Sequence, residues 1–180
     1  PAGYNGASVT KKTKLLNYGD KKIILYQGAL NTGRGIEWIL NAMPLIPNAV
    51  FVLIGDGDIK IELIRMTEAL KITDRVDFLG KIPAQELQDY TTSADLGVCL
   101  LENKGLSYYY SLPNRIFAFM HAGVPVLATD FPEIRKIVEK YRTGVLISDY
   151  KPEFIANKIN EILYKPFPTE HFDELKTNFC

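Results

Sequence analysis

The sequence predicts an α/β fold built on a doubly wound, parallel, six-stranded sheet of the Rossmann-like type. Six short runs are rich in β-branched residues, and most are continuously apolar, which is typical of strands covered on both faces. Segments with the periodicity of amphipathic helices lie between these runs. Strands that alternate with helices form βαβ units with right-handed crossovers, and such units give a parallel sheet.

The predicted strands follow one another through most of the chain. In order they are Ile23–Gln27, Val50–Ile54, Arg75–Leu79, Leu96–Leu101, Val124–Ala128 and Val145–Ile147. Because these runs are too apolar to face water, we expect helices on both faces of the sheet.

Four apolar stripes with helical spacing predict the helices between the strands. The stripes are Ile36/Ile39/Leu40/Met43, Ile59/Leu63/Met66/Leu70, Ile134/Ile137/Val138/Tyr141 and Ile155/Ile159/Ile162/Leu163. Proline fits the first turn of a helix, so Pro83 predicts a helix over Ala84–Thr91 and Pro132 predicts the start of the third stripe, with Asp130 as its cap. A further helix is predicted over Ile116–Ala122.

The length of 180 residues predicts one domain. We expect an N-terminal segment or linker at 1–20, the ligand-binding domain at 21–165 and a C-terminal tail at 166–180. The chain begins with Pro1 rather than Met, which leads us to expect a fragment or a processed product. It contains no signal-peptide pattern and no run of eighteen apolar residues, so no membrane-spanning helix is expected.

Charge and cysteine content narrow the class of protein. Lys plus Arg and Asp plus Glu each number 21, and this balance argues against nucleic acid as the main partner. Cys99 lies in an apolar run and Cys180 ends the chain, without metal-binding spacing or a disulfide framework. We therefore expect a reducing, cytoplasmic location and no metal site.

The turns after the strands are the expected ligand site, because open α/β sheets bind ligands beyond the carboxyl ends of their strands. The first turn, Gly28–Gly35, has three glycines and Arg34, which suit close approach to a phosphate group; its alternative is a plain flexible turn. The second, Gly55–Asp58, is interpreted as a turn and helix cap, since the glycine pattern of a dehydrogenase is missing. The third, Phe78–Pro83, is a candidate contact for a base through its backbone groups, or simply a short loop between strand and helix with a packed Phe78.

The fourth connection, Glu102–Arg115, is long, polar and aromatic, and long loops in compact domains are usually functional or disordered. It ends at a helix start with Asn114 and Arg115, which predicts a second anion site. The alternative is a surface loop whose tyrosines cover the end of the sheet.

Several ordered motifs resemble the retaining glycosyltransferases that have two facing Rossmann-like domains, the GT-B architecture of the glycosyl transferases group 1 family. They are Tyr26-Gln27-Gly28 with Gly33-Arg34-Gly35, Leu53–Gly57, Val76–Gly80, Ala94–Gly97, Leu112–Phe117 and Met120–Asp130. Their order and spacing agree from about Ile23 to Leu163. The likeness covers only the C-terminal domain of such enzymes, which binds the sugar-nucleotide donor.

The resemblance implies a hexosyltransferase-type donor domain in polysaccharide biosynthesis, which would move a sugar from a nucleoside-diphosphate sugar to a glycan or lipid-linked acceptor with retention. It implies no cofactor and no metal, an acceptor-binding N-terminal domain as partner, membrane contact only through that absent half, and no activity for this domain alone. The implied donor-binding residues are Gly28, Gly33, Arg34, Gly35, Phe78, Leu79, Gly80, Tyr110, Ser111, Leu112, Pro113, Asn114 and Arg115; no catalytic residue is assigned.

Two glutamates of the family pattern are missing. Tyr110 stands where the family has a glutamate for the donor sugar, and Ala118 where it has one for the ribose hydroxyls. This departure keeps two alternatives open. One is a degenerate GT-B domain that acts as an interaction module, and the other is a sugar-nucleotide epimerase of the same architecture.

Overall fold

The computed structural model describes residues 18–165, 168 and 172 of the chain. Their strands are β1 (Lys22–Gln27), β2 (Ala49–Ile54), β3 (Val76–Gly80), β4 (Leu96–Cys99), β5 (Val126–Thr129) and β6 (Gly144–Ile147). All neighbours pair in parallel, in the order β3-β2-β1-β4-β5-β6. The predicted six-stranded parallel sheet is confirmed.

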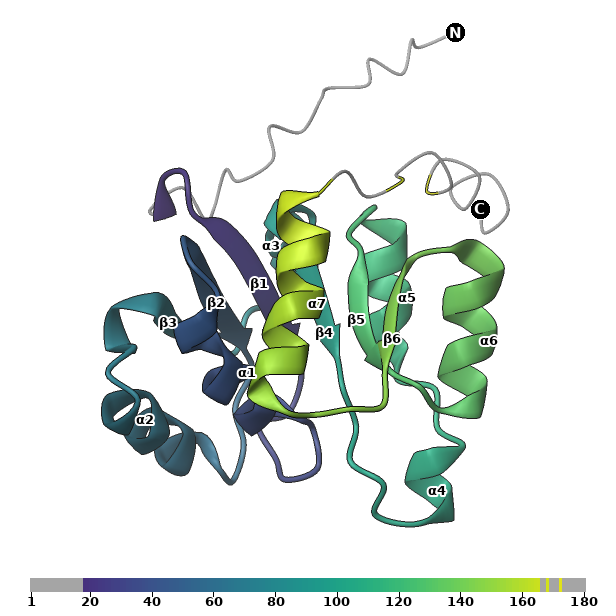
Figure 1. The fold of residues 1–180 in the computed structure, drawn as a ribbon, viewed down its shortest axis with the longest axis horizontal. Helices are drawn as coiled ribbons and strands as arrows, with labels where there is room; N and C mark the ends of the chain where they lie inside the picture. Colours follow the sequence, from purple (N-terminus) through teal and green to yellow (C-terminus); the bar gives the residue numbers. More distant parts are fainter. Residues whose placement is uncertain (1–17, 166–167, 169–171, 173–180) are drawn as a thin grey trace, which may run out of the picture.

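Helices connect successive strands of this sheet, and a last helix follows β6. They are α1 (Ile36–Ala42), α2 (Lys60–Ala69), α3 (Ala84–Ser93), α4 (Leu106–Tyr109), α5 (Asn114–His121), α6 (Pro132–Tyr141) and α7 (Pro152–Tyr164), with short 3-10 turns at Met43–Leu45 and Thr73–Arg75. The four-residue α4 was not predicted, because so short a helix produces no apolar stripe. Figure 1 shows α4 beyond the sheet, at the end where β4 stops.

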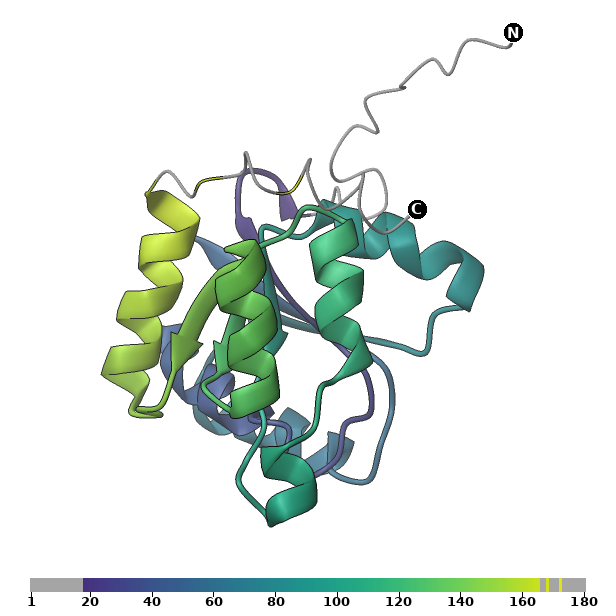
Figure 2. The ribbon, with the colours of Figure 1, turned by 90° about the vertical axis from the view of Figure 1, so that its right-hand side faces the viewer.

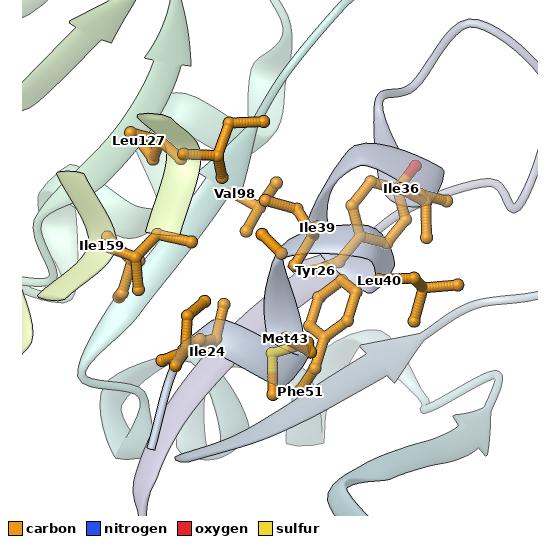
Figure 3. Packing of buried hydrophobic residues seen from close by; sticks show 14 of the residues in the cluster. Ile24, Tyr26, Ile36, Ile39, Leu40, Met43, Phe51, Val98, Leu127 and Ile159 are labelled. Atoms are coloured by element: carbon orange, nitrogen blue, oxygen red, sulfur yellow. The ribbon is translucent and has the colours of Figure 1, made fainter. Parts of the chain in front are cut away.

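Side chains of each strand alternate between two apolar layers, so each face of the sheet has its own core. On one face, Ile24 and Tyr26 pack with buried residues of α1 and α7, and on the other Ile23 and Leu25 pack with those of α5 and α6. Figures 1 and 2 show α7 on one face and α5 on the other, and Figure 3 shows Tyr26 and Phe51 among the aliphatic side chains of the first layer. This double cover explains why the strands are continuously apolar.

Two strand boundaries differ from the prediction by two residues, and the others agree to within one residue. β4 ends at Cys99, although Leu100 and Leu101 continue the apolar run. The Leu101 N–H donates to Thr129 Oγ1 at 2.8 Å, and the next N–H, of Glu102, donates to the Gly33 carbonyl at 2.9 Å. These residues stay buried but leave the ladder to join the turn after β1. β5 starts at Val126 rather than Val124, because Gly123 adopts a φ of 69° and ends the turn after α5.

The segments before β1 and after α7 each include a residue that contacts the domain. Tyr18 donates a hydrogen bond from its hydroxyl to the Asp77 carboxylate on β3. Phe172 is 3% exposed and belongs to the apolar layer that contains α5 and α6. Residues 1–17 of the predicted N-terminal segment, and 166–167, 169–171 and 173–180 of the predicted tail, lie outside the described residues.

Candidate functional site

A cavity of about 650 Å³ opens at the carboxyl edge of the sheet, next to the point where the strand order reverses between β1 and β4. Such a reversal leaves a crevice, because the connections on its two sides run to opposite faces of the sheet. The turns after β1, β2 and β3 and the first turns of α3 and α5 form the walls. The lining residues are Gln27, Gly28, Ala29, Ile54, Gly55, Asp56, Lys81, Ile82, Leu87, Asn114, Arg115 and Ala118.

Backbone hydrogen bonds join three turns into one floor. The Gly28 N–H donates to the Ile54 carbonyl at 2.9 Å, and the Gly55 N–H donates to the Gly80 carbonyl at 2.9 Å. Gly55 has a φ of 136°, and a β-carbon there would lie 1.9 Å from the Gly28 carbonyl oxygen. Only glycine allows the turns after β1 and β2 to approach this closely.

Arg115 is one of two cations that line the cavity, and it is less exposed than the other, Lys81. Its guanidinium carbon lies 5.2 Å from the centre of the Tyr26 ring, and its Nη2 donates to the Leu100 carbonyl at 3.3 Å. Its Nε is buried without a hydrogen-bond partner, and among the described residues no carboxylate forms an ion pair with it. A guanidinium fixed in place without a counter-charge is suited to bind an anion.

The guanidinium also affects the acidity of its neighbours. Burial raises the pKa of Tyr26, and the charges of Arg115 and Arg34 oppose this rise. Burial likewise raises the pKa of the Cys99 thiol to about 11, again opposed by Arg115. Both groups are therefore neutral near pH 7, and the charge beside them stays uncompensated.

The structure brings only some of the predicted donor-binding residues to the cavity. Gly28, Asn114 and Arg115 line it. Arg34 is half-buried near Tyr26 but is not a lining residue, and the backbone of Gly33 faces the fourth connection instead, where a β-carbon would lie 3.2 Å from the Lys104 side chain. Lys104 was not predicted, although it is the first cation of that connection.

The third turn and the fourth connection also differ from the expected pattern. Phe78, Leu79 and Gly80 form β3 itself, and the next two residues, Lys81 and Ile82, line the cavity in their place. The stretch from Tyr110 to Pro113 lies between α4 and α5 outside the lining, and the Ser111 hydroxyl donates to the Tyr108 carbonyl at 2.8 Å.

The other lining residues were not among the donor-binding residues predicted from the sequence. Asp56 was interpreted as part of a cap, yet it lines the cavity, as do the apolar side chains of Ile54 and Leu87. Gln27 is 6% exposed, and Thr91 Oγ1 donates to its Oε1 at 2.8 Å. Ala118 contributes only a methyl group one helical turn beyond Asn114. Gln27, Ile54 and Asp56 could have been found from their positions at the ends of neighbouring strands, whereas Leu87 and Ala118 lie within α3 and α5.

Among residues 18–165, 168 and 172, no group of three or more His, Cys, Asp or Glu side chains could hold a metal ion. Within the same part of the chain, no helix has the length and apolarity needed to cross a membrane.

Comparisons with known proteins agree on one family. The profile described as "Glycosyl transferases group 1" matches residues 9–178. An uncharacterized glycosyltransferase of Methanocaldococcus jannaschii is 29% identical over 147 residues, which are 80% of this chain and 36% of that protein. A GDP-mannose-dependent α-(1-6)-phosphatidylinositol monomannoside mannosyltransferase of Mycolicibacterium smegmatis is 23% identical over 153 residues, covering 82% of this chain and 40% of that protein.

Solved structures share the fold. The Anabaena HepE protein, crystallised with UDP and glucose, superposes with a TM-score of 0.78 at 19% identity, over 94% of this chain and 47% of that one. The chain thus spans less than half the length of each of these three proteins. The Rossmann-like sheet agrees with that of GT-B structures.

Proposed function

Because the chain belongs to the glycosyl transferases group 1 family, we propose that its cavity binds the nucleoside-diphosphate part of a sugar donor. The observation that carries this proposal is the uncompensated guanidinium of Arg115. It lies at the start of α5 and next to the Gly28 turn, where a β-carbon would be 3.6 Å from its Nη1. A diphosphate placed there would form a charge-assisted hydrogen bond with Arg115, which has no carboxylate partner among the described residues.

The same geometry suits sugar transfer. When the bond between the sugar and the diphosphate breaks, negative charge grows on the departing phosphate oxygens. Arg115 is already fixed by Tyr26 and Leu100, so it would stabilise this charge without reorganising. The proposed reaction is transfer to a glycan or lipid-linked acceptor with retention. The acceptor would be bound by a second domain of a longer protein, without which this chain is inactive.

Ala118 favours one second candidate function. It lines the cavity as a methyl group at the position where the family pattern has a ribose-binding glutamate. A domain that has lost donor binding could persist as an interaction module. The absence of donor binding in an intact, folded protein would support this candidate.

Isothermal titration with nucleoside diphosphates tests the donor site. We expect GDP or UDP to bind more tightly than the matching nucleoside, because the diphosphate meets Arg115. Arg115→Gln should weaken the diphosphate by about 10–100-fold, the effect of one or two charge-assisted hydrogen bonds, and leave the nucleoside unchanged. Arg65→Gln is the matched control, since Arg65 is exposed on α2 and does not line the cavity.

Two results would contradict the proposal. One is a wild-type chain that binds no nucleotide at millimolar concentration. The other is an Arg115→Gln variant with wild-type affinity for the diphosphate. A parallel Arg34→Gln variant then measures what the first turn contributes, which we expect to be smaller because Arg34 is outside the lining.

A further inference from the structure

Asp56 and Lys81 lie side by side just after the ends of β2 and β3, on the side of the cavity away from Arg115. The Gly55 N–H donates to the Gly80 carbonyl, so the residues that follow each glycine leave the sheet at the same level. Both line the cavity. The Arg115 guanidinium lies over Tyr26 and next to the Gly28 turn at the end of β1, so the ends of β2 and β3 are one and two strands away, which is on the order of 5–10 Å.

Much of the rest of the lining is apolar. It includes Ile54, Ile82, Leu87 and Ala118, whose side chains cannot exchange hydrogen bonds with a ligand. Gln27 also lines the cavity, and its Oε1 already accepts a hydrogen bond from Thr91. This arrangement matches the layout of a nucleotide. Arg115 is the anion-binding group, the aliphatic side chains form an apolar wall, and Asp56 and Lys81 are a polar pair on the other side. The phosphates of the nucleotide would meet Arg115, and its flat base would lie against the aliphatic wall.

The polar pair offers one acceptor group and one donor group. Asp56 is held in place, because its Oδ1 accepts the Gly57 N–H at 2.8 Å and its carbonyl accepts the Leu30 N–H at 3.0 Å. Its carboxylate can only accept hydrogen bonds, whereas the Lys81 ammonium can only donate them. Lys81 is exposed, and none of the ion pairs between described residues involves it.

We infer that the nucleobase read by this pair is guanine, so that the donor is a GDP-sugar; this rests on the proposed function. Guanine has two neighbouring donors, N1–H and the N2 amine, which a carboxylate accepts together. Its O6 and N7 are neighbouring acceptors that suit an ammonium group. Asp56 and Lys81 can therefore satisfy both edges at once.

Other bases fit the pair less well. Uracil has a single donor, N3–H, between two carbonyl oxygens that would repel the Asp56 carboxylate. Adenine and cytosine each offer one exocyclic amine beside a ring acceptor, so the carboxylate gains one hydrogen bond and faces a lone pair. Hypoxanthine keeps O6, N7 and N1–H of guanine but lacks the N2 amine, which makes IDP a probe of Asp56 alone.

The test is titration of the 180-residue chain with GDP, IDP, UDP and ADP. We expect GDP to bind at least about tenfold more tightly than each of the other three. Asp56→Asn should bring GDP and IDP to within about threefold of each other, because the amide no longer accepts both donors. Lys81→Gln should weaken GDP and IDP by the same factor, since both carry O6 and N7.

Asp58→Asn is the matched control. Asp58 is the next acidic residue, is exposed and does not line this cavity, so its substitution should leave the ratio of GDP to IDP affinity unchanged. UDP affinity equal to or above that of GDP, or equal affinities for GDP and IDP in the wild-type chain, would overturn the inference while donor binding itself stands. An unchanged ratio in a folded Asp56→Asn variant would also overturn it. If none of the four nucleotides binds, the proposed function fails with it.

Discussion

Gly55 occupies the point where the turns after β1, β2 and β3 meet, and replacing it with alanine tests how strictly that junction is constrained. Its φ of 136° is a region that L side chains rarely adopt, and the added β-carbon would lie 1.9 Å from the Gly28 carbonyl oxygen. Non-bonded carbon and oxygen atoms do not approach so closely, so the turn after β1 must move. We expect Gly55→Ala to destabilise the fold and to open the cavity floor.

The size of the effect follows from two contributions. The unfavourable backbone conformation costs about 1–3 kcal/mol. Moving the turns weakens two backbone hydrogen bonds, Gly28 N–H to Ile54 and Gly55 N–H to Gly80, each with a net contribution of about 0.5–1.5 kcal/mol. The expected loss of unfolding free energy is about 2–6 kcal/mol.

Gly105→Ala separates these contributions. Gly105 has nearly the same φ, 132°, but a β-carbon there would have no heavy atom within 4 Å. This variant should show the conformational cost alone, about 1–3 kcal/mol. Urea unfolding followed by circular dichroism measures both. Equal losses in the two variants would refute the argument that close approach of the Gly28 carbonyl requires glycine at position 55.

Three further predictions concern the core and the charged groups. In Gly97→Ala the new β-carbon would lie 2.5 Å from the Phe119 ring, so unfolding free energy should fall by about 1–3 kcal/mol; adding Phe119→Leu should cost less than the sum of the single changes in a double-mutant cycle, and simple additivity would contradict this contact. Burial raises the pKa of Cys99 to about 11, so in a Cys180→Ser background a thiol reagent at mildly alkaline pH should label the chain only after urea unfolds it; labelling of the native chain would disprove this. A hydrogen bond from Arg135 on α6 lowers the pKa of Asp130. The stability that this carboxylate contributes is therefore complete above its unfolded-state pKa, and it is lost as the pH falls through the lower folded-state value. Because the pair is exposed, Asp130→Asn should flatten the acid limb of a stability-against-pH curve only slightly, and a large change would contradict it.

Part of the site could be predicted because its position depends on chain connectivity. Gly28 and Arg115 were found from the rule that ligands bind beyond the carboxyl ends of parallel strands. Arg34 met the same criterion, yet it is not among the lining residues, since sequence position does not say which way a side chain in a turn points. Asp56 was assigned to a turn and helix cap because the glycines on either side of it are typical of a turn.

The sequence by itself determined the layers of this protein. Runs such as Val50–Ile54 are apolar at every position, which is compatible only with strands covered on both faces, and the helical stripes between them imply parallel connections. Its ordered motifs also indicated the family. These properties are local or depend on the order of elements, so they can be inferred without coordinates.

Only the tertiary structure decided which turns meet. The strand order puts the ends of β2 and β3 side by side, and this alone places Asp56 next to Lys81, 25 positions apart in the chain. It also puts the Arg115 guanidinium over Tyr26, without an ion-pair partner among the described residues. Hydrogen bonds and charge pairs between distant segments depend on packing, which no local pattern of residues encodes.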